Sequence, residues 1–189
     1  MLFKPDPNPP TVQQIAKAFR LTGWLSFWTQ AVLTVVSTII LLFAAASSGL
    51  RPANSAPSPG TGSGLLLTFC GLGALGFSIY WAFRYTRLGR RLSAKDSEAR
   101  PKKADTIQAV RIGITLNLGG MLLTLLGLGA TLGGLFVKAA TQQGSVFNND
   151  PSRLIQAVDI LVVQSSINIM LGLFVGLVAG FFLLNRIIR

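Results

Sequence analysis

The side chains of this chain that could do chemistry are mostly amides and hydroxyls set within long apolar stretches. They are Ser26, Gln30, Thr34 and Thr38 in the first stretch, Asn117 in the third, and Gln164 and Asn168 in the fourth. The first four recur every four residues and so share one face of a helix. In hydrocarbon such groups need internal partners, which turns them toward other helices. They can bond neighbouring helices together, or they can line a polar pathway through a bundle.

One acid, Asp159, stands at the start of the last apolar stretch. An ionisable residue inside a membrane is a functional candidate by default. Asp159 lies close to the edge of the stretch, where a solvated acid near a helix N-terminus is also a satisfactory explanation. The sequence leaves both interpretations open.

Catalytic and metal-binding groups are scarce. The chain has no histidine, no pair of carboxylates within an apolar stretch and no glycine loop suited to phosphate. The soft metal ligands within these stretches are Cys70, Met121 and Met170. A single cysteine also excludes an intramolecular disulfide. We therefore expect neither an enzyme nor a metal or cofactor site.

Glycines are placed where helices could approach each other closely. Gly172, Gly176 and Gly180 form a repeated small-xxx-small face. Further steps of four residues extend this face to Asn168 and Gln164. The sequence therefore predicts that the whole face lies inside a bundle, together with the polar groups of the first and third stretches.

A basic segment, residues 84–111, separates the second and third apolar stretches. Its nine bases are Arg84, Arg87, Arg90, Arg91, Lys95, Arg100, Lys102, Lys103 and Arg111. The whole chain has a net charge of +11, which in a soluble protein would suggest nucleic acid. Because these bases flank apolar stretches, anionic lipid headgroups are the simpler partner. An acidic protein is the alternative, and we expect no nucleic acid.

Four long stretches without charge must position these groups. They are Leu21–Leu50, Pro52–Phe83, Ile112–Val137 and Ile160–Asn185. Each is long enough to cross the hydrocarbon core, which takes about 20 residues. We predict an all-α, polytopic membrane protein with four transmembrane helices, at about 24–46, 65–83, 112–137 and 160–184. Residues 24–187 would form one transmembrane domain, preceded by a cytoplasmic segment, 1–23.

Cap signals predict where the helices begin. Thr11 and Gln14 form a capping-box pattern that starts a short amphipathic helix. That helix is either separate from the first span or continuous with it and bent near Gly23. Asp105 marks a start for the third helix, and Asp150, which precedes a proline, marks one for the fourth. The first residues of the basic segment should prolong the second helix.

Several blocks of the chain resemble one known family. They are RLTGWLSFWTQ (20–30), WAFRYTRLGRRL (81–92), RIGITLNLGGMLLTLLG (111–127) and VDILVVQSSINIMLGLFVGLVAGFFLLNRI (158–187). The chain is similar to the four-span family of the chloroplast inner-envelope protein known both as permease in chloroplasts and as a component of the inner-envelope import translocon, with its cyanobacterial relatives. The N-terminus lacks transit-peptide character, which favours the cyanobacterial type.

The resemblance implies one of two functions. One is transport of iron or a related small solute across an envelope-type membrane. The other is a non-transporting place in a larger membrane complex, such as a protein translocon or an assembly machine. It also implies a plasma or thylakoid membrane of the cyanobacterial kind, or the inner envelope in the plant branch. Four spans make a narrow bundle, so we expect a homo-oligomer or a subunit of a larger complex.

The basic residues predict the orientation of the chain. Fourteen of the seventeen Lys and Arg residues lie in the N-terminal segment, the central segment and the C-terminus, and three lie in the two other loops. Because positively charged loops stay on the cytoplasmic side, both termini should be cytoplasmic. A cysteine introduced at Ser97 should react with an impermeant thiol reagent from the cytoplasmic side, and one at Ser58 only from the other side. The reverse labelling pattern would overturn this topology.

Overall fold

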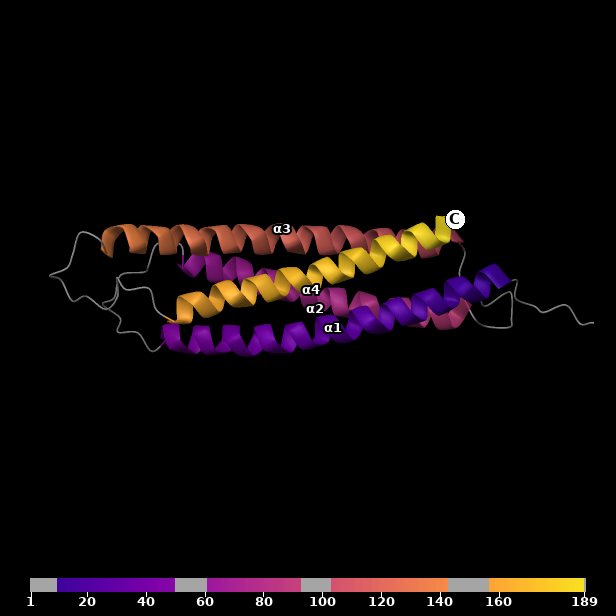
Figure 1. The fold of residues 1–189 in the computed structure, drawn as a ribbon, viewed down its shortest axis with the longest axis horizontal. Helices are drawn as coiled ribbons and strands as arrows, with labels where there is room; N and C mark the ends of the chain where they lie inside the picture. The colour runs from indigo at the N-terminus through magenta and orange to yellow at the C-terminus, as the bar shows by residue number, and fades with distance from the viewer. Residues whose placement is uncertain (1–9, 50–60, 93–102, 143–156, 189) are drawn as a thin grey trace, which may run out of the picture.

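The computed structural model describes residues 10–49, 61–92, 103–142 and 157–188, and each range is a single α-helix. The helices are α1 (Pro10–Gly49), α2 (Thr61–Leu92), α3 (Lys103–Gln142) and α4 (Ala157–Ile188). Figure 1 shows them side by side, with successive helices running in opposite directions. Each helix packs against the next and α4 returns to α1, which closes the ring. The prediction of an all-α fold with four candidate spanning helices is confirmed.

The start of α1 and the end of α4 lie at the same end of the bundle, together with the end of α2 and the start of α3 (Figure 1). We call this the basic end, because Lys17, Arg20, Arg84, Arg87 and Arg111 lie near it. The opposite end carries the end of α1, the start of α2, the end of α3 and the start of α4.

The helices extend beyond the apolar stretches that predicted them. α1 is continuous through Gly23, so the interpretation as one long helix is right and a separate N-terminal helix is wrong. α2 continues into the basic segment as far as Leu92. α3 begins at Lys103, which places Asp105 in its first turn and not at the cap. The predicted start at Asp150 lies outside the described residues, which resume in α4 at Ala157.

The helices are longer than a bilayer requires. α1 and α3 have 40 residues each, or about 60 Å, whereas the hydrocarbon core is about 30 Å thick. They therefore continue past the membrane on at least one side. At the basic end the interior is filled by a cluster of Phe19, Trp81, Tyr85, Val110, Leu183 and Ile187. The bundle thus stays packed well beyond its most apolar segment.

α2 and α3 meet along a line on which small residues face larger ones. Gly64, Gly71 and Ser78 recur every seven residues on α2, and Thr131, Thr124 and Asn117 do so on the antiparallel α3. A Cβ at Gly64 would collide with Thr131, and one at Gly71 would collide with Thr124. Between these levels the small residue is on α3, because a Cβ at Gly127 would lie 2.9 Å from the Cβ of Leu67 and 3.1 Å from the Thr68 nitrogen. This seven-residue spacing is that of helices wound into a left-handed supercoil.

Most buried polar side chains in this contact bond to their own helix. The hydroxyls of Thr68, Thr124 and Thr131 donate to the carbonyl four residues earlier, at 2.8, 2.8 and 3.0 Å, and each of these carbonyls belongs to a glycine. The Asn117 Nδ2 likewise donates to the Gly113 carbonyl at 2.9 Å. Such local bonds satisfy polar groups without a partner helix. The α2–α3 contact therefore contains many buried polar side chains, most of which find their hydrogen-bond partner within their own helix.

Gly71→Ala should loosen the α2–α3 contact, because its new Cβ collides with Thr124. We expect a loss of about 1–3 kcal/mol, as for other overpacked sites, measured as the midpoint of denaturant unfolding in mild detergent. Gly73→Ala is the matched control, since a Cβ there meets nothing within 4 Å and alanine is the better helix former. Thr124→Ala should restore part of the loss. Equal midpoints for Gly71→Ala and Gly73→Ala would contradict this packing.

Candidate functional site

The predicted polar residues of α1 and α3 meet at one level of the bundle, which we call the central polar layer. It comprises Ser26 and Gln30 of α1, Ser78 of α2 and Asn117 of α3, all buried. Ser78 Oγ donates to Asn117 Oδ1 at 2.6 Å, and Gln30 Nε2 donates to Ser26 Oγ at 3.1 Å. Gly176 of α4 lies between the two amides, because a Cβ there would stand 2.5 Å from Gln30 Nε2 and 2.8 Å from Asn117.

Apolar side chains close the central polar layer on both sides. Toward the opposite end, Leu41, Leu75, Ile169 and Leu173 form a buried cluster. Leu75 stands one turn from Ser78, and Leu173 one turn from Gly176. Toward the basic end, Trp81 and Tyr85 belong to the other buried cluster. Buried apolar side chains therefore lie on both sides of the layer along the bundle.

Four polar atoms at or beside this layer are buried without a hydrogen-bond partner among the described residues. Gln30 Oε1, Thr34 Oγ1 and Ser37 Oγ are on α1, and the Tyr85 hydroxyl is on α2. A carbonyl oxygen such as Gln30 Oε1 can accept a bond from a small polar guest. The layer itself consists of two amides and two hydroxyls, Ser26, Gln30, Ser78 and Asn117.

The polar face of α1 turns as it crosses the bundle. Ser26 and Gln30 are fully inside, whereas Thr34 and Thr38 are half-buried and Ser37 takes the interior position. The Thr38 hydroxyl donates to the Thr34 carbonyl at 2.7 Å. Ser37 instead joins α4, because its carbonyl accepts a bond from Ser165 Oγ at 3.2 Å.

The prediction that one face of α4 lies inside the bundle is correct for its glycines and wrong for Gln164 and Asn168. Gly172, Gly176 and Gly180 are buried. Gln164 is exposed on the outer surface, Asn168 is half-buried, and the two bond to each other at 3.2 Å. A four-residue step turns about 40° around a helix, so three steps from Gly176 carry Gln164 about 120° away.

Asp159 is buried in an ion pair with Lys138, which lies just beyond the predicted third span, 112–137. Lys138 Nζ, near the end of α3, lies 2.8 Å from Asp159 Oδ2, and the two side chains are 7% and 2% exposed. Asp159 is therefore not a solvated acid, although it does lie in the first turn of α4, and it is not a lone intramembrane charge. The pair joins α3 to α4 at the opposite end of the bundle. Breaking a buried pair by removing one partner costs about 3–5 kcal/mol, so we assign it a structural role.

The predicted anionic-surface residues lie where α2 and α3 leave the bundle at the basic end. Arg84, Arg87, Arg90 and Arg111 are exposed. Arg84 lies over the Trp81 ring at 4.8 Å and Arg87 over the Phe83 ring at 5.2 Å. Arg91 and Lys103 are helical positions at the end of α2 and the start of α3. Lys95, Arg100 and Lys102 lie outside the described residues.

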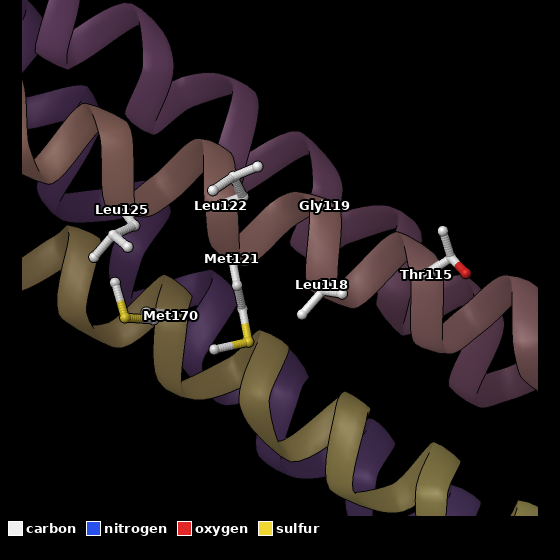
Figure 2. A pocket seen from close by; sticks show the side chains of 7 residues that line it. All are labelled: Thr115, Leu118, Gly119, Met121, Leu122, Leu125 and Met170. Carbon is white, nitrogen blue, oxygen red and sulfur yellow. The ribbon is translucent and has the colours of Figure 1, made fainter.

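The soft ligands do not converge. Cys70 is exposed on α2, whereas Met121 and Met170 border an apolar groove of about 550 Å³ between α3 and α4. Figure 2 shows Met121 reaching from α3 toward α4, with Leu118 and Leu125 beside it. Within the four described helices, no three His, Cys, Asp or Glu residues lie close enough to hold a metal ion.

These features define the class of the molecule as a multi-pass membrane protein built on a closed four-helix bundle. The chain belongs to the family described as "Protein of unknown function (DUF3611)", whose model matches residues 9–188. It is 34% identical over 181 residues to "Protein TIC 21, chloroplastic" of Arabidopsis thaliana, a match that covers 93% of this chain. The chain spans 58% of that relative's length. No solved structure matches the chain.

Gly176→Leu should disrupt the central polar layer. The new side chain would displace Gln30 and Asn117, whose amide atoms would lie within 2.8 Å of a Cβ at this position. We expect a fall in the thermal midpoint in detergent of several degrees, as for an overpacked core. Gly133→Leu on α3 is the control, because a Cβ there meets nothing within 4 Å. Gln30→Ala should recover part of the loss in Gly176→Leu, and an unchanged midpoint for Gly176→Leu alone would contradict this geometry.

Proposed function

We propose that this chain is a non-enzymatic, non-transporting subunit of a larger membrane complex. The observation that carries the proposal is the contrast between its interior and its surface. The central polar layer is enclosed by two apolar clusters. In the same bundle, Gly73, Gly76, Gly119, Gly129 and Gly133 face outward, with open space where a Cβ would stand. Outward glycines allow another helix to approach closely, which is how helices associate in lipid.

Two apolar grooves flank Gly119 and favour α3 as the contact helix. One groove, of about 470 Å³, is bordered by Gly73, Phe77 and Gly119 between α2 and α3. The other, of about 550 Å³, is bordered by Gly119, Met121 and Met170 between α3 and α4 (Figure 2). Gly119, which has no side chain, thus lies on the surface between the two grooves. A helix of a partner subunit could rest there with little rearrangement of this chain.

The subunit role is one of the two functions that the family resemblance implies. The family resemblance includes a component of an import translocon, and the relative's name, TIC 21, chloroplastic, is consistent with that group. We therefore propose a translocon or an assembly machine as the kind of complex. On the same resemblance we propose that the complex lies in a plasma or thylakoid membrane of the cyanobacterial type.

Transport of iron or another small solute is a second candidate, favoured by the central polar layer. Gln30 Oε1 is buried without a donor, so the layer could hold a small polar guest in an opened conformation. A path would require the Leu75 and Trp81 levels to separate. Iron uptake into liposomes that depends on the protein, and that falls in a folded Gln30→Leu variant, would favour transport over the subunit role.

Gly119→Leu should release the chain from its complex while leaving the bundle folded, because the added side chain fills the contact surface and meets nothing within 4 Å of its Cβ. Native gels of solubilised membranes would measure the shift from a large complex to the free protein. Gly129→Leu is the matched control: it has the same change, helix and open surroundings, but borders neither groove.

A neighbour can be located through Cys70, which is exposed on α2 and shares a helix face with Gly73 and Phe77. A photo-crosslinker on Cys70 should yield an adduct of defined size. The control is a photo-crosslinker on Val32→Cys in a Cys70→Ala background. Val32 is also exposed but lies on α1, outside the proposed contact surface, so it should yield no such adduct. Free migration of the unaltered protein would overturn the subunit proposal, and equal behaviour of Gly119→Leu and Gly129→Leu would overturn the assignment of the contact to Gly119.

A further inference from the structure

At the basic end, α1 and α2 border a hollow of about 540 Å³ that is lined by both basic and apolar side chains. Its lining residues are Lys17, Arg20, Leu21, Trp24, Thr86 and Arg90. The three bases come from two helices and face one space. We propose that this hollow binds the headgroup of one anionic glycerophospholipid, with a phosphodiester held by Lys17, Arg20 and Arg90.

The two helices are held tightly together beneath the hollow. A Cβ at Gly89 would lie 3.0 Å from the Phe19 Cβ, 3.1 Å from the Ala16 carbonyl and 3.2 Å from the Arg20 nitrogen. A Cβ at Gly23 would lie 2.9 Å from Thr86 Cγ2. Because α1 and α2 approach closely at both glycines, the backbone positions of Arg20 and Arg90 are fixed relative to each other. A site with a rigid base loses little freedom when a ligand binds.

Charge complementarity identifies the ligand as an anion. No ion pair to Lys17, Arg20 or Arg90 occurs within the described helices, where the acids are Asp105 at the start of α3 and Asp159, which bonds to Lys138. Nearby Arg84 and Arg87 lie against the rings of Trp81 and Phe83, whereas Arg90 lines the hollow. Three cations that share one space repel one another, and a bound phosphate relieves that repulsion.

The apolar part of the hollow identifies the anion as a lipid. Leu21 and Trp24 are 74% and 57% exposed, and the same side of α1 continues with exposed Leu25 and Trp28. Indole rings favour the membrane interface, so this part of α1 lies at headgroup depth. Basic pockets between helices at this depth suit phosphate headgroups, and acyl chains can follow the apolar surface below. A free phosphate or a nucleic acid would leave that surface without a partner.

The test uses the full-length protein, purified in mild detergent, with dioleoyl phosphatidylglycerol as the probe lipid. Native mass spectrometry should show one phosphatidylglycerol retained in preference to phosphatidylcholine. Lys17→Gln, Arg20→Gln and Arg90→Gln combined should weaken binding about a hundredfold, because each of these bases makes a direct charge-assisted contact with the bound phosphodiester. The matched control combines Arg84→Gln, Arg87→Gln and Arg111→Gln, which removes the same charge from the same end and should leave this binding within a few fold.

A second readout places the lipid. Brominated phosphatidylglycerol should quench the tryptophan fluorescence, and the quenching should be lost when Trp24 and Trp28, whose rings lie 5.6 Å apart, are both replaced by Phe. The substituted bases are on the surface, so the variants should keep the far-ultraviolet circular dichroism and thermal midpoint of the parent protein. Arg20→Gln alone, expected to weaken binding about fivefold, serves if the triple variant does not fold.

Four results would overturn the proposal. Equal loss of binding in the two triple variants would mean only diffuse attraction to the basic end. Equal retention of phosphatidylglycerol and phosphatidylcholine would remove the role of charge. Binding of glycerol phosphate as tight as that of the lipid would identify a soluble anion as the ligand. Quenching that survives when both Trp24 and Trp28 are replaced by Phe would place the lipid elsewhere.

Discussion

The bundle depends on one constraint, which is that helices in lipid gain nothing by hiding apolar side chains from their surroundings. Lipid tails are as apolar as leucine, so association must come from close backbone approach and interhelical hydrogen bonds. This chain meets the constraint with small residues at nearly every level of the α2–α3 contact, such as Gly71 beside Thr124. Hydroxyls then add bonds between helices, such as Thr68 to Ser166 at 3.2 Å and Ser165 to Ser37 at 3.2 Å. Many leucines, such as Leu122, Leu125 and Leu126, can therefore face outward.

The sequence predicted the number and type of the helices because each is set by one long apolar stretch, and that signal is strong. It also placed Ser26, Gln30, Asn117 and Gly176 in the interior, where the structure has them. It failed at Gln164, because the four-residue step drifts around a helix. The interior positions of α4 alternate steps of four and three, through Val162, Ser166, Ile169 and Leu173.

The sequence analysis did not predict two features of the structure, because each depends on residues from two different helices. The pairing of Lys138 with Asp159 depends on which helices lie together, although in an antiparallel hairpin the two positions fall at the same depth. The basic hollow likewise joins Arg20 to Arg90 across two helices. One local signal was available and unused: glycine four residues before a threonine or asparagine recurs at Gly64, Gly113, Gly120 and Gly127. Each of these marks a buried polar side chain that bonds to the glycine carbonyl.

The seven-residue spacing of the α2–α3 contact also leaves its register open to error. If α3 slid by seven residues, about 10 Å along the axis, Thr131 would face Gly71 in place of Gly64, and small would still meet large. Packing alone therefore distinguishes poorly between the two alignments. The bond from Ser78 to Asn117 is lost in the slid form, so one polar pair can select the alignment that the glycines permit. A buried asparagine fixes register in coiled coils in the same manner, at some cost in stability.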